Sequence, residues 1–298
     1  MKTSDKEMNK SKIFILQSTH TNYPMKLHFI LYLFLSAFIL PLNAQTFPQP
    51  ELWLQDTAAQ TIERHGVYYT IINGQRVAVS KPDTNYNKSC LYSRTILLPD
   101  SIMATDSIYY VTDITDAFTG CKHLRGIILP KGLTFIAPMA FAWCRSLQQI
   151  DLPDKIENIY SMTFLYCRSL KQVKLPLFLT KIGDSAFRGC SRLKSIVIPP
   201  FVTIIESSAF EGCLHLKRIE IPQSVVAIRD FAFGGCENIN EMYVYASNPP
   251  ILGGDTTISL PVFDDKVRNI PVHIPKGSKL LYTHAPEWSL FTNYIDDL

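Results

Sequence analysis

The cysteines are the residues of this chain with the widest range of chemistry, because a thiolate can attack electrophiles, bind zinc or form a disulfide. Six recur with a 23-residue period and a seventh precedes them after a longer interval, giving Cys90, Cys121, Cys144, Cys167, Cys190, Cys213 and Cys236. Disulfides are usual in exported chains, but they need Cβ atoms about 3.8 Å apart and a twisted geometry. Zinc needs ligands that converge from closely spaced pairs. We favour a buried ladder of small apolar thiols.

Two aromatic residues stand beside consecutive cysteines of this series. Trp143 and Tyr166 each precede a cysteine at the position where four other repeats have glycine, and Arg145 and Arg168 follow at the same offset. Two rings with two arginines alongside suit a hot spot for a protein partner or a platform for a sugar. The alternative is packing of the rings against the N-terminal part of the chain.

A basic stripe occupies another position of the same period. The column reads Arg125, Gln148, Lys171, Lys194, Lys217 and Asn240 and is largely basic. Residues 117–231 as a whole carry fifteen basic and eight acidic residues. This balance predicts attraction to anionic surfaces or acidic proteins. Nucleic acid is not an expected partner, because no nucleic-acid-binding motif is present. The competing interpretation is a solvated face that keeps the protein in solution.

Lys174 belongs to a neighbouring series that should point outward from a row of short strands. Such a row presents a continuous surface for binding. The two outward columns read Gly126, Gln149, Gln172, Ser195, Arg218 and Glu241, and then Ile128, Asp151, Lys174, Val197, Glu220 and Tyr243.

Catalysis is not expected from these residues. The chain has none of the G-x-S-x-G, H-E-x-x-H, P-loop or EF-hand motifs. His123 and His215 share a column but lie four repeats apart, which is roughly 19 Å at the spacing of neighbouring strands. The sequence therefore predicts a protein that is not an enzyme and that uses no cofactor or metal.

The element that must position all these side chains is a 23-residue repeat. Its six segments begin at residues 117, 140, 163, 186, 209 and 232, and their columns align without slippage, as in Phe118, Phe141, Phe164, Phe187, Phe210 and Phe233. The pattern L-x-x-I-x-L-P alternates as a short strand does and ends at a proline. We predict a right-handed leucine-rich-repeat solenoid, a β-rich stack of coils with parallel strands and little helix. One coil alone cannot outweigh its conformational entropy, so the stack is required.

Degenerate coils are expected at both ends. Residues 90–116 read as an N-capping repeat, 117–245 as the regular repeats, and 246–298 as a C-capping repeat and tail, in which Trp288, Phe291 and Ile295 would close the core on a short helix. Residues 45–89 form a predicted N-terminal β-module, with a hairpin over 66–79 that turns at Asn73-Gly74.

The segment 25–44 has the layout of a secretory signal peptide. A lysine is followed by twelve apolar residues, a break at Pro41 and the small residue Ala44, and twelve residues are too few to span a bilayer, which needs about 20. We predict cleavage near Ala44, a secreted or cell-surface mature protein without a transmembrane segment, and residues 1–24 as an over-extension upstream of the true start at Met25.

The repeat LxxIxLPxxLxxIxxxAFxxC, the Asn-Pro-Pro before the last coil and the ending IPKGSKLLYTHAPEWSLF resemble the bacterial BspA-type leucine-rich-repeat proteins. Thr163 and Tyr245 depart from the pattern, at the Ala-Phe pair and the strand-end proline. The resemblance implies adhesion and binding of a host or cell-surface protein. The alternative function is a carbohydrate-binding accessory or hydrolase-associated protein, whose ligand would be a glycan.

Overall fold

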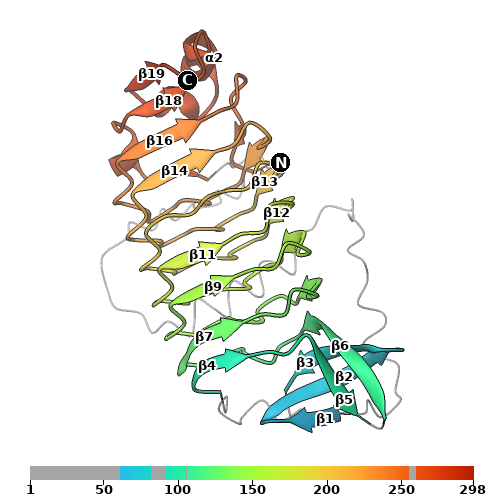
Figure 1. The fold of residues 1–298 in the computed structure, drawn as a ribbon. Coiled ribbons are helices and arrows are strands. Elements are labelled where there is room, and N and C mark those ends of the chain that lie inside the picture. The colour runs from blue at the N-terminus through green and yellow to red at the C-terminus, as the bar shows by residue number, and fades with distance from the viewer. Residues whose placement is uncertain (1–60, 82–91, 105, 255–259) are drawn as a thin grey trace, which may run out of the picture. The chain divides into compact units, whose positions relative to one another are not determined.

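The computed structural model describes residues 61–81, 92–104, 106–254 and 260–298 of the 298-residue chain (Figure 1). All of them belong to one compact unit that begins at Ala58. The predicted signal peptide, the segment before it and Cys90 lie outside the described residues. No helix in the described ranges is long and apolar enough to cross a membrane.

A hairpin opens the described chain, as the alternating sequence around Asn73-Gly74 predicts. Its two strands pair with Asn73 opposite Arg76, and Gly74 has a φ of 44°, which glycine adopts without steric cost. Two strands that follow residue 90 join the same sheet, in the order β1-β2-β3-β6-β5, with β8 beside β6. These strands are β1 (Thr61–Arg64), β2 (Val67–Asn73), β3 (Arg76–Ser80), β5 (Ser101–Ala104) and β6 (Ser107–Ile114).

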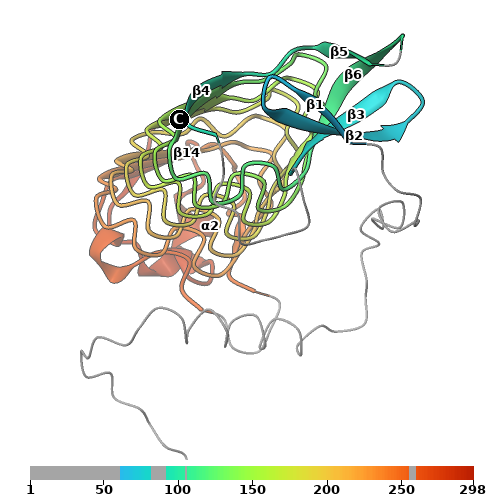
Figure 2. The ribbon, with the colours of Figure 1, turned by 90° about the horizontal axis from the view of Figure 1, so that it is seen from below.

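The rest of the unit is a solenoid, in which each 23-residue repeat makes one coil and successive coils lie over one another (Figure 2). The first side of every coil but one holds a short parallel strand, and pairs such as Val173 with Ile150 confirm the 23-residue register. Two four-stranded sheets result, in the orders β11-β9-β7-β4 and β14-β16-β18-β19. Their strands are β4 (Arg94–Leu97), β7 (Leu124–Ile128), β9 (Gln149–Asp151), β11 (Gln172–Lys174), β14 (Arg218–Ile221), β16 (Glu241–Val244), β18 (Val272–Ile274) and β19 (Tyr294–Asp296).

The coil between these two sheets lacks the strand that its sequence predicts. Ile196 and Ile198 are buried as expected and Val197 points outward, but residues 195–198 are not assigned to a strand. The backbone hydrogen bonds on either side, from Lys194 N to Lys171 O and from Lys217 N to Lys194 O, are long at 3.4 and 3.5 Å. The coil also ends in two prolines, Pro199 and Pro200, where its neighbours have one.

The second side of each coil holds a strand of only two residues. These strands pair in parallel, with Ile159 beside Ile182 and Ile182 beside Ile205, and all three isoleucines are buried. Their order is β10-β12-β13-β15-β17. Their bounds, with that of β8, are β8 (Phe135–Ile136), β10 (Asn158–Ile159), β12 (Lys181–Ile182), β13 (Ile204–Ile205), β15 (Ala227–Ile228) and β17 (Ile251–Leu252).

The third side is a turn that carries the phenylalanine and cysteine columns. Here the backbone N–H of Phe141 donates to Thr163 O at 3.0 Å, and that of Phe164 donates to Ala186 O at 2.8 Å, so neighbouring coils are also joined where no strand is present. Seven phenylalanine rings, from Phe118 to Phe263, stack with centroids 5.2 to 5.4 Å apart and planes within 8° of parallel. Burial of such rings, with that of the leucine and isoleucine columns, stabilises each coil.

The cysteines form a ladder of five buried free thiols, Cys144, Cys167, Cys190, Cys213 and Cys236. Each thiol donates to the carbonyl of the phenylalanine 26 residues earlier, in the preceding coil, at 3.1 to 3.4 Å. The prediction that Cys121 is also a free thiol of this ladder was wrong, because Cys121 is disulfide-bonded. The residue 26 positions before it is Thr95, so no ladder phenylalanine precedes it.

The C-terminal end closes the core with aromatic side chains. Trp288 is fully buried, its Nε1–H donates to Pro250 O at 2.7 Å, and its ring meets Tyr282 edge-on at 5.2 Å. The prediction of Phe291 in this cap is confirmed, but that of Ile295 is wrong, since the tail ends in strand β19 and buries Tyr294. The helical segments within the described residues are α2 (Lys279–His284) and two 3-10 turns, Asp265–Val267 and Trp288–Leu290.

Candidate interaction surface

The predicted basic stripe lies on one long edge of the solenoid. Arg125, Lys171, Lys194 and Lys217 are all exposed. Lys171 and Lys217 directly precede β11 and β14, and Arg125 is the second residue of β7. Hydrogen bonds link the backbone of this column, from Gln148 N to Arg125 O at 3.0 Å and onward to Lys217. The structure therefore brings together these four residues in a row parallel to the solenoid axis.

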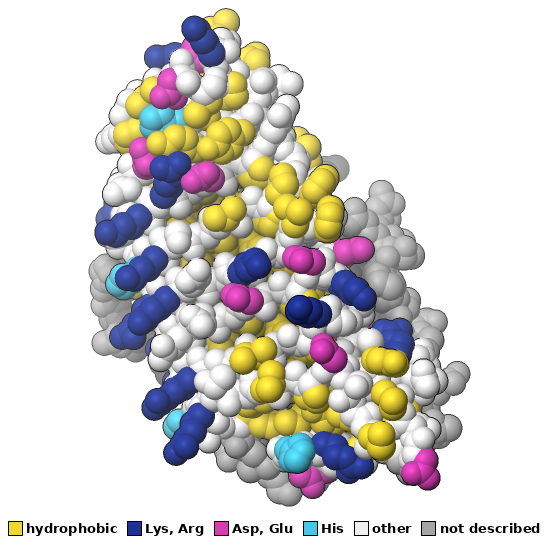
Figure 3. Space-filling model, viewed as in Figure 1, with side chains coloured by type: hydrophobic (Ala, Val, Ile, Leu, Met, Phe, Trp, Pro, Cys, Tyr) yellow, Lys and Arg dark blue, Asp and Glu magenta, His cyan; other side chains and the backbone are white. Residues whose placement is uncertain are grey.

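The row is wider than the sequence column alone indicates. In five coils the segment between the cysteine and the strand holds eight basic residues and no acidic one, and all eight are exposed. We call this surface the basic edge. It consists of Lys122, Arg125, Arg145, Arg168, Lys171, Arg192, Lys194 and Lys217. Figure 3 shows dark blue side chains following one edge of the molecule, beside the strand positions. Sequence reasoning missed Lys122, although it shares the column of Arg145 and Arg168, and it missed Arg192, which stands in the next column of the same turn.

Other faces pair their charges between neighbouring coils. Arg188 contacts Glu211 at 2.8 Å, and Lys181 contacts Glu206 at 2.6 Å. Such cross-coil pairs stabilise a stack in the way that cross-strand pairs stabilise a sheet. By contrast, no residue of the basic edge forms an ion pair with a carboxylate within 61–81, 92–104, 106–254 and 260–298. Like charges on adjacent coils repel one another and lower the stability of the fold.

Trp143 and Tyr166 occupy strained backbone positions beside the basic edge. Their φ angles are 60° and 55°, at the position where Gly189 and Gly212 have 71° and 72°. A residue with a Cβ in this left-handed region costs of order 1 kcal/mol or more relative to glycine. The Tyr166 ring covers Gly189 so closely that a Cβ there would lie 2.3 Å from its Cδ1.

The two predicted arginines are joined to these residues through the backbone, and one of them also contacts a ring. Arg145 N and Arg168 N bond to the carbonyls of Trp143 and Tyr166 at 2.8 Å, and the Arg168 guanidinium is 5.6 Å from the Tyr166 ring centroid. The structure therefore unites the aromatic pair with the basic edge. Lys174 is the exception, because it lies on the outward side of β11, opposite Asp151 of β9.

The outward side chains of the first side form a second surface, which we call the strand face. It includes exposed apolar residues, with 56% of Ile128 and 77% of Val197 accessible. Lys174 and Asp151 stand between them. Mixed apolar and charged residues on a regular scaffold are suited to contact with a protein.

A stack of three side chains marks the C-terminal part of the strand face. The Arg218 guanidinium lies 3.9 Å from the Tyr243 ring centroid, and the His273 ring lies parallel to Tyr243 at 4.3 Å. Glu241 contacts all three, at 3.4 Å from Arg218, 2.8 Å from the Tyr243 hydroxyl and 3.7 Å from His273. The Tyr243 hydroxyl donates to this carboxylate, which raises the pKa of Tyr243.

Sequence reasoning placed Arg218, Glu241 and Tyr243 among the outward columns but did not identify this stack. Arg218 and Glu241 stand one repeat apart, whereas His273 follows Tyr243 at a longer interval because of the insertion before the last coil. Alignment of IPVHIP with the strand pattern was the available signal. His273 is held from the other side by Asp297, at 3.0 Å from Nδ1.

The ladder thiols are unsuited to catalysis. Burial raises the pKa of Cys144 to about 12, and it raises the pKa values of Cys167, Cys190 and Cys213 above the usual range of a thiol. A nucleophilic cysteine needs the opposite, a lowered pKa and access to substrate. In the described ranges, no group of three or more His, Cys, Asp or Glu side chains is arranged to hold a metal ion.

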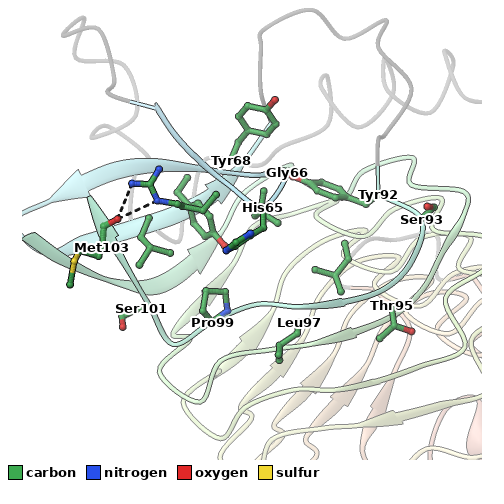
Figure 4. A pocket seen from close by; sticks show the side chains of 15 residues that line it. His65, Gly66, Tyr68, Tyr92, Ser93, Thr95, Leu97, Pro99, Ser101 and Met103 are labelled. Atoms are coloured by element: carbon green, nitrogen blue, oxygen red, sulfur yellow. Dashed lines mark hydrogen bonds between the residues drawn. The ribbon is translucent and has the colours of Figure 1, made fainter. Parts of the chain in front are cut away.

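A cavity of about 710 Å³ lies where the N-terminal sheet meets the first coil (Figure 4). Its lining includes His65, Tyr68 and Leu97, and Arg64 closes one side by donating from Nη2 to Met103 O at 3.0 Å. The cavity is separate from the basic edge. It contains none of the residues that the sequence singled out for binding.

Comparison with known proteins agrees with this architecture. Residues 88–213 match the family model described as BspA type leucine rich repeat region, in six copies. A leucine-rich repeat protein of Treponema pallidum is 26% identical, with a TM-score of 0.51, over 65% of this chain and 86% of that one. One from Bacteroides ovatus is 22% identical, with a TM-score of 0.49, over 74% and 71%.

A leucine rich cell surface protein from Faecalibacterium prausnitzii is 16% identical, with a TM-score of 0.41, over 75% of this chain and 86% of that one. No curated protein matches the chain. The repeat pattern, the parallel ladders at a 23-residue register and the family match lead to one conclusion: the chain is a leucine-rich-repeat solenoid, and its residues 88–213 are repeats of the BspA type.

Proposed function

We propose that this protein is exported and acts outside the cell or on its surface as an adhesion protein. Leucine-rich repeats of this family support a role in protein interaction, typically as a binding scaffold without enzymatic activity. The observation that carries the proposal is the strand face, which combines exposed Val197 with the ordered stack of Arg218, Tyr243 and His273. Export is supported by the signal-peptide pattern of residues 25–44.

The stack has the composition and order of a binding hot spot. Tyrosine and arginine are enriched among the residues that contribute most to protein interfaces. The ion pairs of Arg218 with Glu220 and Glu241, at 2.9 and 3.4 Å, hold the guanidinium over the Tyr243 ring before any partner arrives. Side chains that are already ordered lose less entropy on binding.

The basic edge contributes to the same function at longer range. Its eight exposed cations would attract an acidic partner and raise the rate of encounter, and salt would screen this attraction. Contact itself would then occur on the strand face. The proposed partner is a host or cell-surface protein.

Binding to a panel of purified extracellular matrix proteins tests the proposal. The variant Val197→Asp/Tyr243→Ala should weaken binding to any matrix partner by at least tenfold, because hot-spot residues dominate affinity. Val226→Asp is the matched control, since Val226 is 58% exposed but borders the second side of the coil. Failure of the wild type to bind any protein of the panel, or equal weakening by the control, would overturn the strand-face assignment.

A further inference from the structure

We propose that the basic edge binds a linear anionic polysaccharide, carrying sulfate or carboxylate groups, that lies along the solenoid axis. This inference goes beyond the proposed function, because it assigns a ligand class to a surface other than the strand face. It rests on the direction of the row, its lack of counter-charges and the aromatic pair beside it.

The row has the geometry of a track for an extended chain. Arg125, Lys171, Lys194 and Lys217 belong to one column whose backbones are hydrogen-bonded from coil to coil. Five coils at the spacing of parallel strands extend over about 19 Å. Each of these coils contributes at least one cation, and Arg145 fills the coil whose column position is Gln148. A ligand that matches this row carries anions repeatedly along a line.

The absence of carboxylates along the row is specific to this edge. The fold readily accommodates opposite charges in one column, as Arg188 and Glu211 demonstrate on the third side. The first acid at an equivalent position of the basic edge is Glu237, in the sixth coil, where Lys266 contacts it at 2.6 Å. Among the described residues, these eight cations have no carboxylate partner, and the row ends at an acid that is paired. This leaves their donors available to an external anion.

The aromatic pair indicates that the ligand has apolar faces as well as charge. Trp143 and Tyr166 occupy a left-handed turn position at which Gly120, Gly189 and Gly212 are unstrained. Neither ring belongs to the buried core, so core packing does not account for this choice. The Arg168 guanidinium beside the Tyr166 ring pairs a donor for sulfate or carboxylate with a surface for the C–H face of a sugar ring.

These features favour a polysaccharide over other polyanions. An acidic globular protein would present its carboxylates on a curved surface and would contact only part of a straight row. Nucleic acid also combines phosphates with rings that stack on aromatic side chains. However, single-stranded nucleic acid binds by stacking successive bases on a series of aromatic side chains, and this row has aromatic side chains on two coils only.

Immobilised heparin and alginate serve as sulfated and carboxylated probes, with dextran as the neutral one and double-stranded DNA as the competing polyanion. Lys171→Glu/Lys194→Glu/Lys217→Glu should raise the Kd for heparin or alginate at least tenfold at 150 mM NaCl and should flatten its salt dependence. The control Lys155→Glu/Lys276→Glu/Lys279→Glu makes the same change in net charge at other exposed sites and should leave the Kd within twofold. Tighter binding of heparin than of alginate identifies sulfate as the preferred group.

The variant Trp143→Gly/Tyr166→Gly tests the sugar contact without straining the backbone, because glycine already occupies this position in four coils. It should raise the Kd several-fold while the salt dependence stays unchanged. The proposal is overturned if neither polysaccharide binds, if the control weakens binding as much as the triple variant, if DNA binds as tightly as the better polysaccharide, or if removal of both rings has no effect. The strand-face variant Val197→Asp/Tyr243→Ala should bind heparin normally, so failure of either proposal is distinguishable from failure of the other.

Discussion

At the scale of single residues, the cysteine column is explained by one hydrogen bond rather than by reactivity. The Phe164 carbonyl accepts the N–H of Cys167 in its own coil at 3.1 Å and the thiol of Cys190 in the next coil at 3.2 Å. A carbonyl has two lone pairs, so both donors are accommodated. The thiol is small enough to fit between stacked phenylalanines, and it supplies a donor that alanine lacks.

The same burial predicts how stability depends on pH. Thiols of the unfolded chain ionise near pH 8.5, whereas the folded state holds Cys144, Cys167, Cys190 and Cys213 at raised pKa values. The unfolded state therefore loses protons first, and the free energy of unfolding should fall as pH rises from 7.5 to 9.5, by about 1 kcal/mol for each such thiol. Urea unfolding at the two pH values measures this loss.

The variant Cys190→Ala isolates one thiol of the ladder. It should be less stable than the wild type at pH 7.5, by about 1 to 3 kcal/mol for a lost hydrogen bond and a small cavity, but its stability should depend less on pH. Ser191→Ala, at the next residue, should keep the wild-type dependence. If Cys190→Ala loses as much stability between the two pH values as the wild type, the thiol is not protonated and buried in the way that the structure indicates.

At the scale of elements, the capping segments determine where the solenoid ends. Trp288 is fully buried against Tyr282 and Phe291, and it ties α2 and β19 to the last coil. Trp288→Ala should destabilise this end by about 3 to 5 kcal/mol. Because a coil contacts only its neighbours, amide hydrogen exchange should rise strongly in 262–298 and little in 140–190. Uniform acceleration over all coils would show instead that the cap and the centre unfold as one unit.

Prediction from the sequence was best for the elements in which the 23-residue period is unbroken. The column from Phe118 to Phe233 recurs without a break, and the structure stacks all of its rings. Prediction was poorer where the period breaks. The contact between Tyr243 and His273 bridges an insertion, and Ile295 was assigned to a helix because the tail has no repeat to align with. Residues 195–198 fit the strand pattern but form no strand, since hydrogen-bond lengths depend on how neighbouring coils meet.

For the candidate surfaces, too, the sequence predicted the features that depend on the repeat period and missed those that depend on contacts between side chains. Arg125, Lys171, Lys194 and Lys217 could be grouped from their spacing, because one column of the repeat becomes one row of the structure. The sequence could not predict that the described carboxylates pair with cations on other faces and not with this row, since such ion pairs depend on side-chain positions. The left-handed backbone at Trp143 and Tyr166 was indicated by the glycines of the other coils. The spacing of one column does not show which other columns of the repeat lie on the same edge of the solenoid.

At the scale of the whole molecule, length and binding are coupled, because every coil adds the same rise and its own share of each surface. Removal of residues 163–185 deletes one complete coil. Phe141 would then face Phe187, and the thiol of Cys190 would meet the carbonyl of Phe141 in place of that of Phe164. The ladders would remain continuous, while the basic edge would lose Arg168 and Lys171 together with the Tyr166 ring.

This whole-coil deletion should fold but bind heparin at least tenfold more weakly than the full-length protein. Its circular dichroism spectrum should keep the β-rich form, and its denaturation midpoint should fall only modestly, since one of several equivalent interfaces is lost. Deletion of residues 163–184 is the control, because the one residue that it leaves must bulge out or reverse which side chains face the core. It should lose much more stability. Equal stability of the two deletions would contradict the 23-residue register, and unchanged heparin affinity in the folded whole-coil deletion would contradict the basic edge as a continuous track.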